Sequence, residues 1–114
     1  MSRITSHVLD TSLGRPAAGV SVTLSAQGKD GSWKELGRGV TDADGRAKDL
    51  LLEGSELTVG TYRLTFDTAA YFRARNTETF FPHVEVVFLV GDTKQRYHIP
   101  LLLSPFGYST YRGS

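Results

Sequence analysis

Three histidines, His7, His83 and His98, are the residues of this sequence best suited to proton transfer, and the chain has no cysteine. The unperturbed pKa of histidine is about 6.5, so its ring can act as a general base near neutral pH. The lack of cysteine excludes disulfides, thiolate metal ligands and a cysteine nucleophile. Spacing alone does not establish that any two histidines meet, so the elements that carry them have to be considered.

His7 and His98 each lie in a segment where apolar and polar residues alternate, which is typical of a strand with one buried face. If Ile4 and Val8 are buried, His7 points away from the core. The same reasoning points Arg96 and His98 outward, opposite an apolar face made of Tyr97, Ile99, Leu101 and Leu103. The third histidine, His83, follows Pro82 and is expected to be a solvated loop residue.

The sequence predicts no metal site. Three features would support a zinc site: a histidine pair at i, i+4, a third convergent histidine, or cysteine ligands. The sequence offers none of these. Asp42-Ala43-Asp44-Gly45 resembles part of a calcium loop but lacks the further oxygen ligands and the distal glutamate. We expect a tight turn there, with Gly45 at positive φ. A Ser-His-Asp triad is equally unsupported, because no G-x-S-x-G motif is present.

Alternation with a period of two, interrupted by Gly, Pro and Asp clusters, predicts short antiparallel strands along most of the chain. Turn residues occur at Leu13 to Pro16 and at Gly28 to Gly31. Two segments alternate most clearly, with their apolar residues at Val20, Val22 and Leu24 and at Tyr62, Leu64 and Phe66.

One short helix is predicted, with Asp67 or Thr68 as its N-cap and Ala69 to Arg75 as its body, ending before Asn76. A helix of about two turns needs packing against a sheet to be stable. Roughly seven or eight strands and one helix indicate a β-sandwich.

The segment Val84 to Val90 is apolar on both faces after Glu85, because Val87 and Leu89 are apolar as well as the residues at even positions. Such a strand requires cover on both sides. A small sandwich covers one face itself, so we expect a second subunit on the other.

The whole chain of 114 residues is expected to form a single domain, residues 1–114. A formal net charge of +1 gives no electrostatic basis for binding nucleic acid or an anionic membrane. No apolar run is long enough to span a bilayer, and the first seven residues lack the apolar run of a secretory signal. A cytoplasmic location is therefore expected.

Motifs at both ends resemble those of the transthyretin-like family. Thr5 to Asp10 followed by Gly14-Arg15-Pro16-Ala17 is similar to its N-terminal signature, and Tyr97 to Pro105 is similar to its C-terminal one. The ending Tyr111-Arg112-Gly113-Ser114 resembles the mark of the family's 5-hydroxyisourate hydrolase branch. The middle of the chain also fits, with Asp44-Gly45-Arg46 in a turn after the third strand.

This resemblance implies an all-β, two-sheet transthyretin-like (prealbumin-like) sandwich of about eight strands with one short helix. It also implies edge-paired dimers that meet back to back in a homotetramer, with active sites at the mouths of a central channel. The implied catalytic residues are His7, Arg46, His98 and Ser114, and the implied substrate-binding residues are His7, Arg46 and Tyr111. Neither a cofactor nor a metal is implied.

The implied reaction is hydrolysis of 5-hydroxyisourate to 2-oxo-4-hydroxy-4-carboxy-5-ureidoimidazoline in urate degradation. Either His7 or His98 could take the proton from water, and Arg46 offers a cationic fork for developing negative charge. Two alternatives remain beside this reading: a transthyretin-type carrier of small hydrophobic ligands, and a β-sandwich accessory module. Fold alone does not decide among them.

Overall fold

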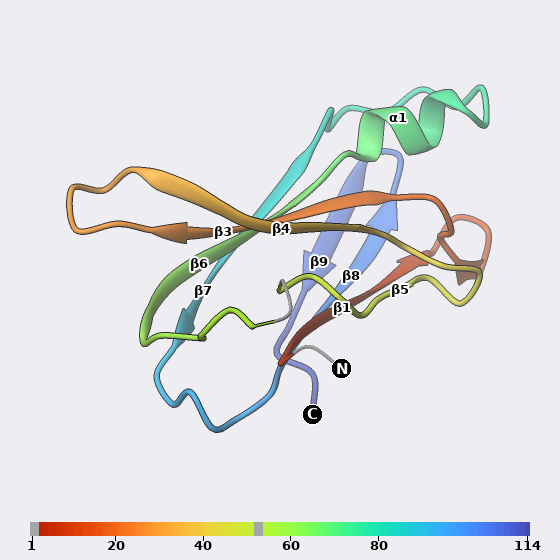
Figure 1. The fold of residues 1–114 in the computed structure, drawn as a ribbon. Coiled ribbons are helices and arrows are strands. Elements are labelled where there is room, and N and C mark those ends of the chain that lie inside the picture. Colours follow the sequence, from red (N-terminus) through yellow and green to blue (C-terminus); the bar gives the residue numbers. More distant parts are fainter. Residues whose placement is uncertain (1–2, 52–53) are drawn as a thin grey trace.

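The computed structural model describes residues 3–51 and 54–114, which form two β-sheets and one short helix (Figure 1). The strands are β1 Ile4–Asp10, β2 Arg15–Pro16, β3 Ser21–Gln27, β4 Trp33–Val40, β5 Arg46–Ala47, β6 Gly60–Phe66, β7 Val84–Val90, β8 Tyr97–Ser104 and β9 Gly107–Thr110. The helix is α1, Thr68–Arg73. The described ranges thus hold nine strands rather than seven or eight, because the two-residue strands β2 and β5 arise where the sequence indicates turns.

The first sheet has the order β2-β1-β8-β9, with β5 also paired to β1, and the second has the order β4-β3-β6-β7. One pair departs from the expected antiparallel arrangement, since β1 and β8 run parallel. Alternation reports which face is buried, not strand direction. Parallel neighbours need only a long crossover connection, and nearly the whole chain separates these two strands.

The core between the sheets is formed by the apolar residues that alternation predicts. The N-terminal strand alternates strictly between buried and half-buried residues, with Ile4 and Val8 inside and His7 outside. The predicted inner residues of β3, β6 and β8 are likewise buried: Val22, Leu24, Tyr62, Leu64, Phe66, Tyr97, Ile99, Leu101 and Leu103. The outward direction of His7 and His98 is confirmed.

Helix α1 begins at Thr68, and Asp67 caps it by accepting a hydrogen bond from the backbone N–H of Ala70. It ends at Arg73, two residues earlier than predicted. The backbone N–H groups of Arg75 and Asn76 donate to carbonyls three residues back, and Asn76 has a φ of 52°. The last predicted turn is therefore a tight turn rather than α-helix. No helix within the described residues could span a membrane.

Strand β7 lies at the edge of the second sheet and is apolar on both faces. Val84, Val86 and Val90 face the core, whereas Val87 and Leu89 are 57% and 74% exposed. The single chain leaves this outer apolar face uncovered.

Candidate active site

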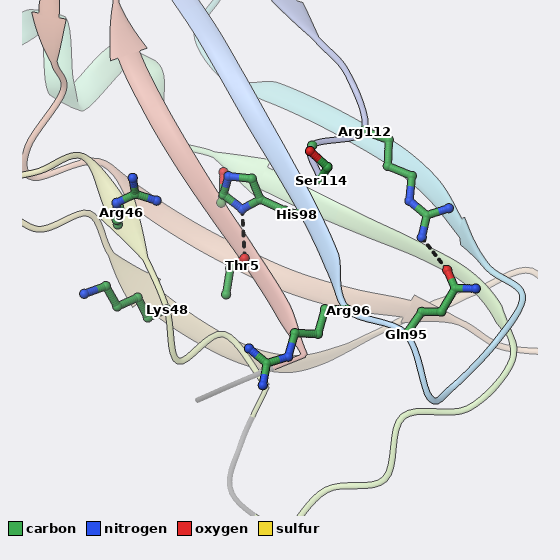
Figure 2. Close-up of a pocket in the computed structure, with 10 residues that line it drawn as sticks. Thr5, Arg46, Lys48, Gln95, Arg96, His98, Arg112 and Ser114 are labelled. Carbon is green, nitrogen blue, oxygen red and sulfur yellow. Dashed lines mark hydrogen bonds between the residues drawn. The ribbon is translucent and has the colours of Figure 1, made fainter.

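A cavity of about 650 Å³ lies at the end of the first sheet where β1 and β8 begin (Figure 2). Its walls come from β1, β5, β8, the segment before β8 and the C-terminal tail. The lining residues are Thr5, Ser6, Arg46, Lys48, Gln95, Arg96, His98, Arg112, Gly113 and Ser114. Segments from both ends of the chain are therefore needed to build it.

His98 is half-buried on β8 and faces this cavity, directly beside Thr5 in the register of β1 and β8. Its Nδ1 lies 2.8 Å from Thr5 Oγ1. Burial and the nearby positive charges of Arg46 and His7 lower the pKa of His98, and a hydrogen bond with Thr5 opposes them. The ring is therefore neutral at neutral pH, which is the form a general base requires.

Arg46 reaches the cavity from β5, which begins after the turn Asp42 to Gly45. In that turn Asp42 Oδ1 accepts hydrogen bonds from the backbone N–H groups of Asp44 and Arg46, at 2.9 and 3.0 Å. Gly45 has a φ of 78°, as predicted, and a Cβ there would lie 2.4 Å from the Val8 carbonyl oxygen. A tight turn pressed against β1 thus fixes the backbone that carries Arg46.

His7 pairs with Arg46 in the register of β1 and β5, but it does not line the cavity as this chain alone forms it. Its Nε2 lies 2.8 Å from the backbone carbonyl oxygen of Asp44. Because a carbonyl only accepts, Nε2 is the donor in this bond. His7 nonetheless lies close enough to influence the pKa of His98.

The C-terminal tail runs beside His98. Strand β9 ends at Thr110, and beyond it Gly113 pairs with His98 in an isolated bridge. The Gly113 N–H donates to the His98 carbonyl oxygen at 2.8 Å. This bridge brings Ser114 to the cavity that Arg46 and His98 line (Figure 2).

Tyr111 lies on a different surface from Arg46. It is 58% exposed and lines a second cavity of about 300 Å³ between β7, β8 and the tail. His98 and Arg112 line both cavities. Within one chain the structure therefore brings Arg46, His98 and Ser114 together, with His7 adjacent and Tyr111 on the other side of His98.

Seven of the ten lining residues were missed by sequence reasoning, and three of them carry a positive charge. Lys48, Arg96 and Arg112 join Arg46 in the cavity wall, and none of the ten lining residues is Asp or Glu. A nearly neutral chain thus concentrates positive charge at one place. The alternation in the sequence already places Arg96 outward, and the same alternation puts Lys48 on one face with Arg46. The net charge of the whole chain does not reveal that these side chains cluster.

His83 lies away from this site. It is exposed, immediately precedes β7, and borders a surface hollow on the second sheet. The solvated loop position predicted for it is confirmed. Within residues 3–51 and 54–114, no group of His, Asp and Glu side chains is arranged to hold a metal ion.

Comparison with known proteins adds independent information. The 5-hydroxyisourate hydrolase of Mus musculus is 47% identical over 114 residues, covering 99% of this chain and 96% of its own length. That of Salmonella typhimurium is 49% identical over 108 residues, covering 95% of this chain and 78% of its own.

Solved structures with the same fold include both a 5-hydroxyisourate hydrolase and a transthyretin. Klebsiella pneumoniae 5-hydroxyisourate hydrolase superposes with a TM-score of 0.83 at 37% identity, covering 97% of this chain and 92% of that one. Sea bream transthyretin in complex with thyroxine superposes with a TM-score of 0.91 at 35% identity, covering 98% of this chain and 95% of that one. These matches confirm the transthyretin-like sandwich. Since the model of the HIUase/Transthyretin family also matches residues 4–113, the chain belongs to that family.

Proposed function

We propose that this protein hydrolyses 5-hydroxyisourate to 2-oxo-4-hydroxy-4-carboxy-5-ureidoimidazoline, a step of urate degradation. The observation that carries the proposal is the cavity that joins His98 to Arg46 in a chain whose relatives at 47–49% identity are 5-hydroxyisourate hydrolases. We infer that residues 1–114 act as one domain.

The reaction adds water to the carbonyl carbon of a cyclic amide and breaks its C–N bond. A base takes one proton from the attacking water, the oxygen becomes part of a new carboxylate, and the proton passes to the leaving nitrogen. His98 suits the part of base, because its lowered pKa keeps the ring neutral and because it lines the cavity.

Arg46 and its basic neighbours suit the negative charge that develops on the carbonyl oxygen. A guanidinium offers a planar fork of donors, and such preorganised charge stabilises an oxyanion strongly where water is excluded. The product carries a carboxylate, so Lys48, Arg96 and Arg112 also favour its accommodation.

We assign His7, Tyr111 and Ser114 supporting parts in the same site. His7 helps to bind substrate next to Arg46, and Ser114 contributes a polar group on the His98 side of the cavity. Tyr111 forms a flat wall for the heterocycle where a neighbouring subunit closes the channel. This arrangement belongs to a homotetramer, whose interface would cover the outer apolar face of β7.

The test is the loss of ultraviolet absorbance from freshly generated 5-hydroxyisourate when the protein is added. We expect the wild type to accelerate this loss far above the spontaneous rate, and His83→Asn to match it. His98→Asn should lose most of the acceleration. A wild-type rate no different from buffer would overturn the proposal.

A carrier of small hydrophobic ligands is the second candidate, because transthyretin with bound thyroxine is among the structural matches. The basic cavity with His98 does not favour an apolar ligand. Thyroxine titration separates the two: tight binding without hydrolysis would favour the carrier.

A further inference from the structure

The ring of His98 is contacted by two residues to which the proposed mechanism gives no part. One is Thr5, whose Oγ1 lies 2.8 Å from Nδ1; a dashed line marks this contact in Figure 2. The other is Gly113, whose backbone passes along the opposite side of the imidazole.

The Thr5 contact occupies one ring nitrogen of His98, Nδ1. A hydroxyl can donate or accept, so the 2.8 Å distance alone leaves the direction of this hydrogen bond open. If Nδ1 carries the proton, it donates to Thr5 Oγ1 and the lone pair lies on Nε2. If Thr5 donates instead, Nε2 carries the proton and cannot accept one from water. The proposed part of His98 as a base therefore requires the proton on Nδ1, because Thr5 occupies Nδ1 in either case.

The Gly113 contact leaves no room for a side chain. A Cβ at position 113 would lie 2.6 Å from His98 Cδ2, 3.3 Å from His98 Cγ and 3.3 Å from Pro100 Cγ. The backbone cannot retreat freely, because the Gly113 N–H is bonded to the His98 carbonyl oxygen. Glycine is required here by space, and its backbone prevents the ring from turning toward the tail.

We propose that Thr5 and Gly113 are positioning residues that together hold His98 in the Nδ1–H tautomer and in one ring orientation, leaving Nε2 free to accept a proton. The kinetic part of this inference rests on the proposed hydrolysis. The choice of tautomer rests on it as well, but the tautomer and the ring orientation can both be measured on the protein without substrate.

Thr5→Val tests the first contact, with Thr5→Ser as its matched control. Valine keeps the shape of threonine and suits a strand but removes the hydroxyl, whereas serine retains it. Nitrogen-15 NMR of the imidazole at a pH where His98 is neutral should show a smaller Nδ1–H population in Thr5→Val and a wild-type population in Thr5→Ser. We expect kcat to fall by about tenfold or more in Thr5→Val with KM little changed, a part of what a general base contributes.

Gly113→Ala tests the second contact, with Gly107→Ala as its control in the same C-terminal segment. A Cβ at Gly107 would lie 3.7 Å from Ser104 Oγ, an ordinary contact. Gly113→Ala should shift the His98 ring resonances and lower kcat by about tenfold or more, as misplacement of a base does. Gly107→Ala should change neither.

A purely structural part for either residue would give a different pattern. In that case a variant would melt at a lower temperature yet keep wild-type His98 resonances and kcat, and the proposal would be overturned for that residue. If the wild type itself did not hydrolyse 5-hydroxyisourate, the function would fail, while the NMR result would still decide whether Thr5 and Gly113 position the ring.

Discussion

The two histidines at the site differ in how they are held, and this difference gives them different expected parts. His98 bonds through Nδ1 to Thr5, whereas His7 bonds through Nε2 to the Asp44 carbonyl. The carbonyl acceptor puts the lone pair of neutral His7 on Nδ1, and the tautomer proposed above puts the lone pair of neutral His98 on Nε2. Only His98 lines the cavity of the single chain.

We expect His7→Asn to slow turnover by about a hundredfold, the lower range for a lost acid–base group. The residue lies beside Arg46 and influences His98, so it should contribute to binding and to the charge of the site. The melting temperature should change little, because His7 lies on the outer face of β1. Steady-state kinetics beside His83→Asn provide the comparison. If His7→Asn turned over substrate at the wild-type rate, His7 would not belong to the active site.

Arg46→Lys should be markedly impaired although the charge is kept. Lysine presents a point charge and cannot reproduce the two parallel donors of a guanidinium. The measurement is kcat/KM with Arg38→Lys as control, since Arg38 is an exposed residue of the other sheet paired with Glu35. Wild-type kinetics for Arg46→Lys would mean that Arg46 only forms part of the turn and takes no part in catalysis.

The pH dependence of the rate should follow His98. Its pKa is lowered by burial and by the charges of Arg46 and His7. The ring therefore remains neutral when the pH falls just below about 6.5, the ordinary pKa of histidine. Activity should fall on the acid side only as the pH drops through this lowered pKa. NMR titration of His98 in Arg46→Gln should give a higher pKa than in the wild type, because one positive charge is gone. An unchanged pKa would show that Arg46 does not act on this ring.

The same lowered pKa makes the contribution of His98 to stability depend on pH. The unfolded chain protonates His98 near pH 6.5, whereas the folded chain does so only at lower pH, so the unfolded state binds more protons in between. The contribution of His98 to stability is therefore complete above about pH 6.5. It declines as the pH falls from there through the lowered pKa.

At the scale of elements, helix α1 is tied to the first sheet through a buried polar contact. Tyr71 donates to Asp10 Oδ2 at 2.7 Å, joining the helix to the end of β1. Burial, followed by the bond to Asp10 and its charge, raises the pKa of Tyr71 to about 12. Burial would raise the pKa of Asp10, but hydrogen bonds from Ser12, Tyr71 and Leu13 hold it below its ordinary value.

Tyr71→Phe should therefore destabilise the fold by about 1–3 kcal/mol, the usual cost of leaving a buried acceptor without one donor. The ring and its packing are kept, so the loss reports the hydroxyl. Urea denaturation gives the free energy of unfolding, with Tyr108→Phe at a 42% exposed position as the control. Equal midpoints for the two variants would mean that the Asp10 contact adds nothing.

Sequence patterns predict which way these elements face better than which elements meet. Alternation places Thr5, His7 and His98 outward, and the structure agrees. It contains no information that Thr5 lies beside His98, 93 residues away, because that depends on the parallel pairing of β1 with β8. The bridge from Gly113 to His98 lies beyond the end of β9 and has no periodic signal.

The charge of the cavity is a second feature that local patterns conceal. Arg46, Lys48, Arg96 and Arg112 come from three separate segments, and only the fold brings them together. The resemblance to the family identifies Arg46 among them, because a family motif is matched residue by residue. It gave no reason to select Lys48 or Arg96.

At the scale of the whole molecule, the outer face of β7 is a surface that one chain leaves unfinished. Val87 and Leu89 expose large apolar side chains there, and the small cavity that Tyr111 lines opens between β7, β8 and the tail. A second subunit seated against β7 would cover these side chains and enclose the Tyr111 side of His98. Burial of apolar area is the main favourable contribution to such association.

We therefore predict a tetramer in solution at micromolar concentration, measured by light scattering coupled to size exclusion. Leu89→Lys should lower the mass, because a charge would be buried in an apolar contact, and should lower activity with it. Val59→Lys is the matched control: Val59 is 67% exposed but lies outside the strands, so mass and activity should not change. A wild-type monomer with full activity would contradict the shared channel and remove the reason for placing Tyr111 in the site.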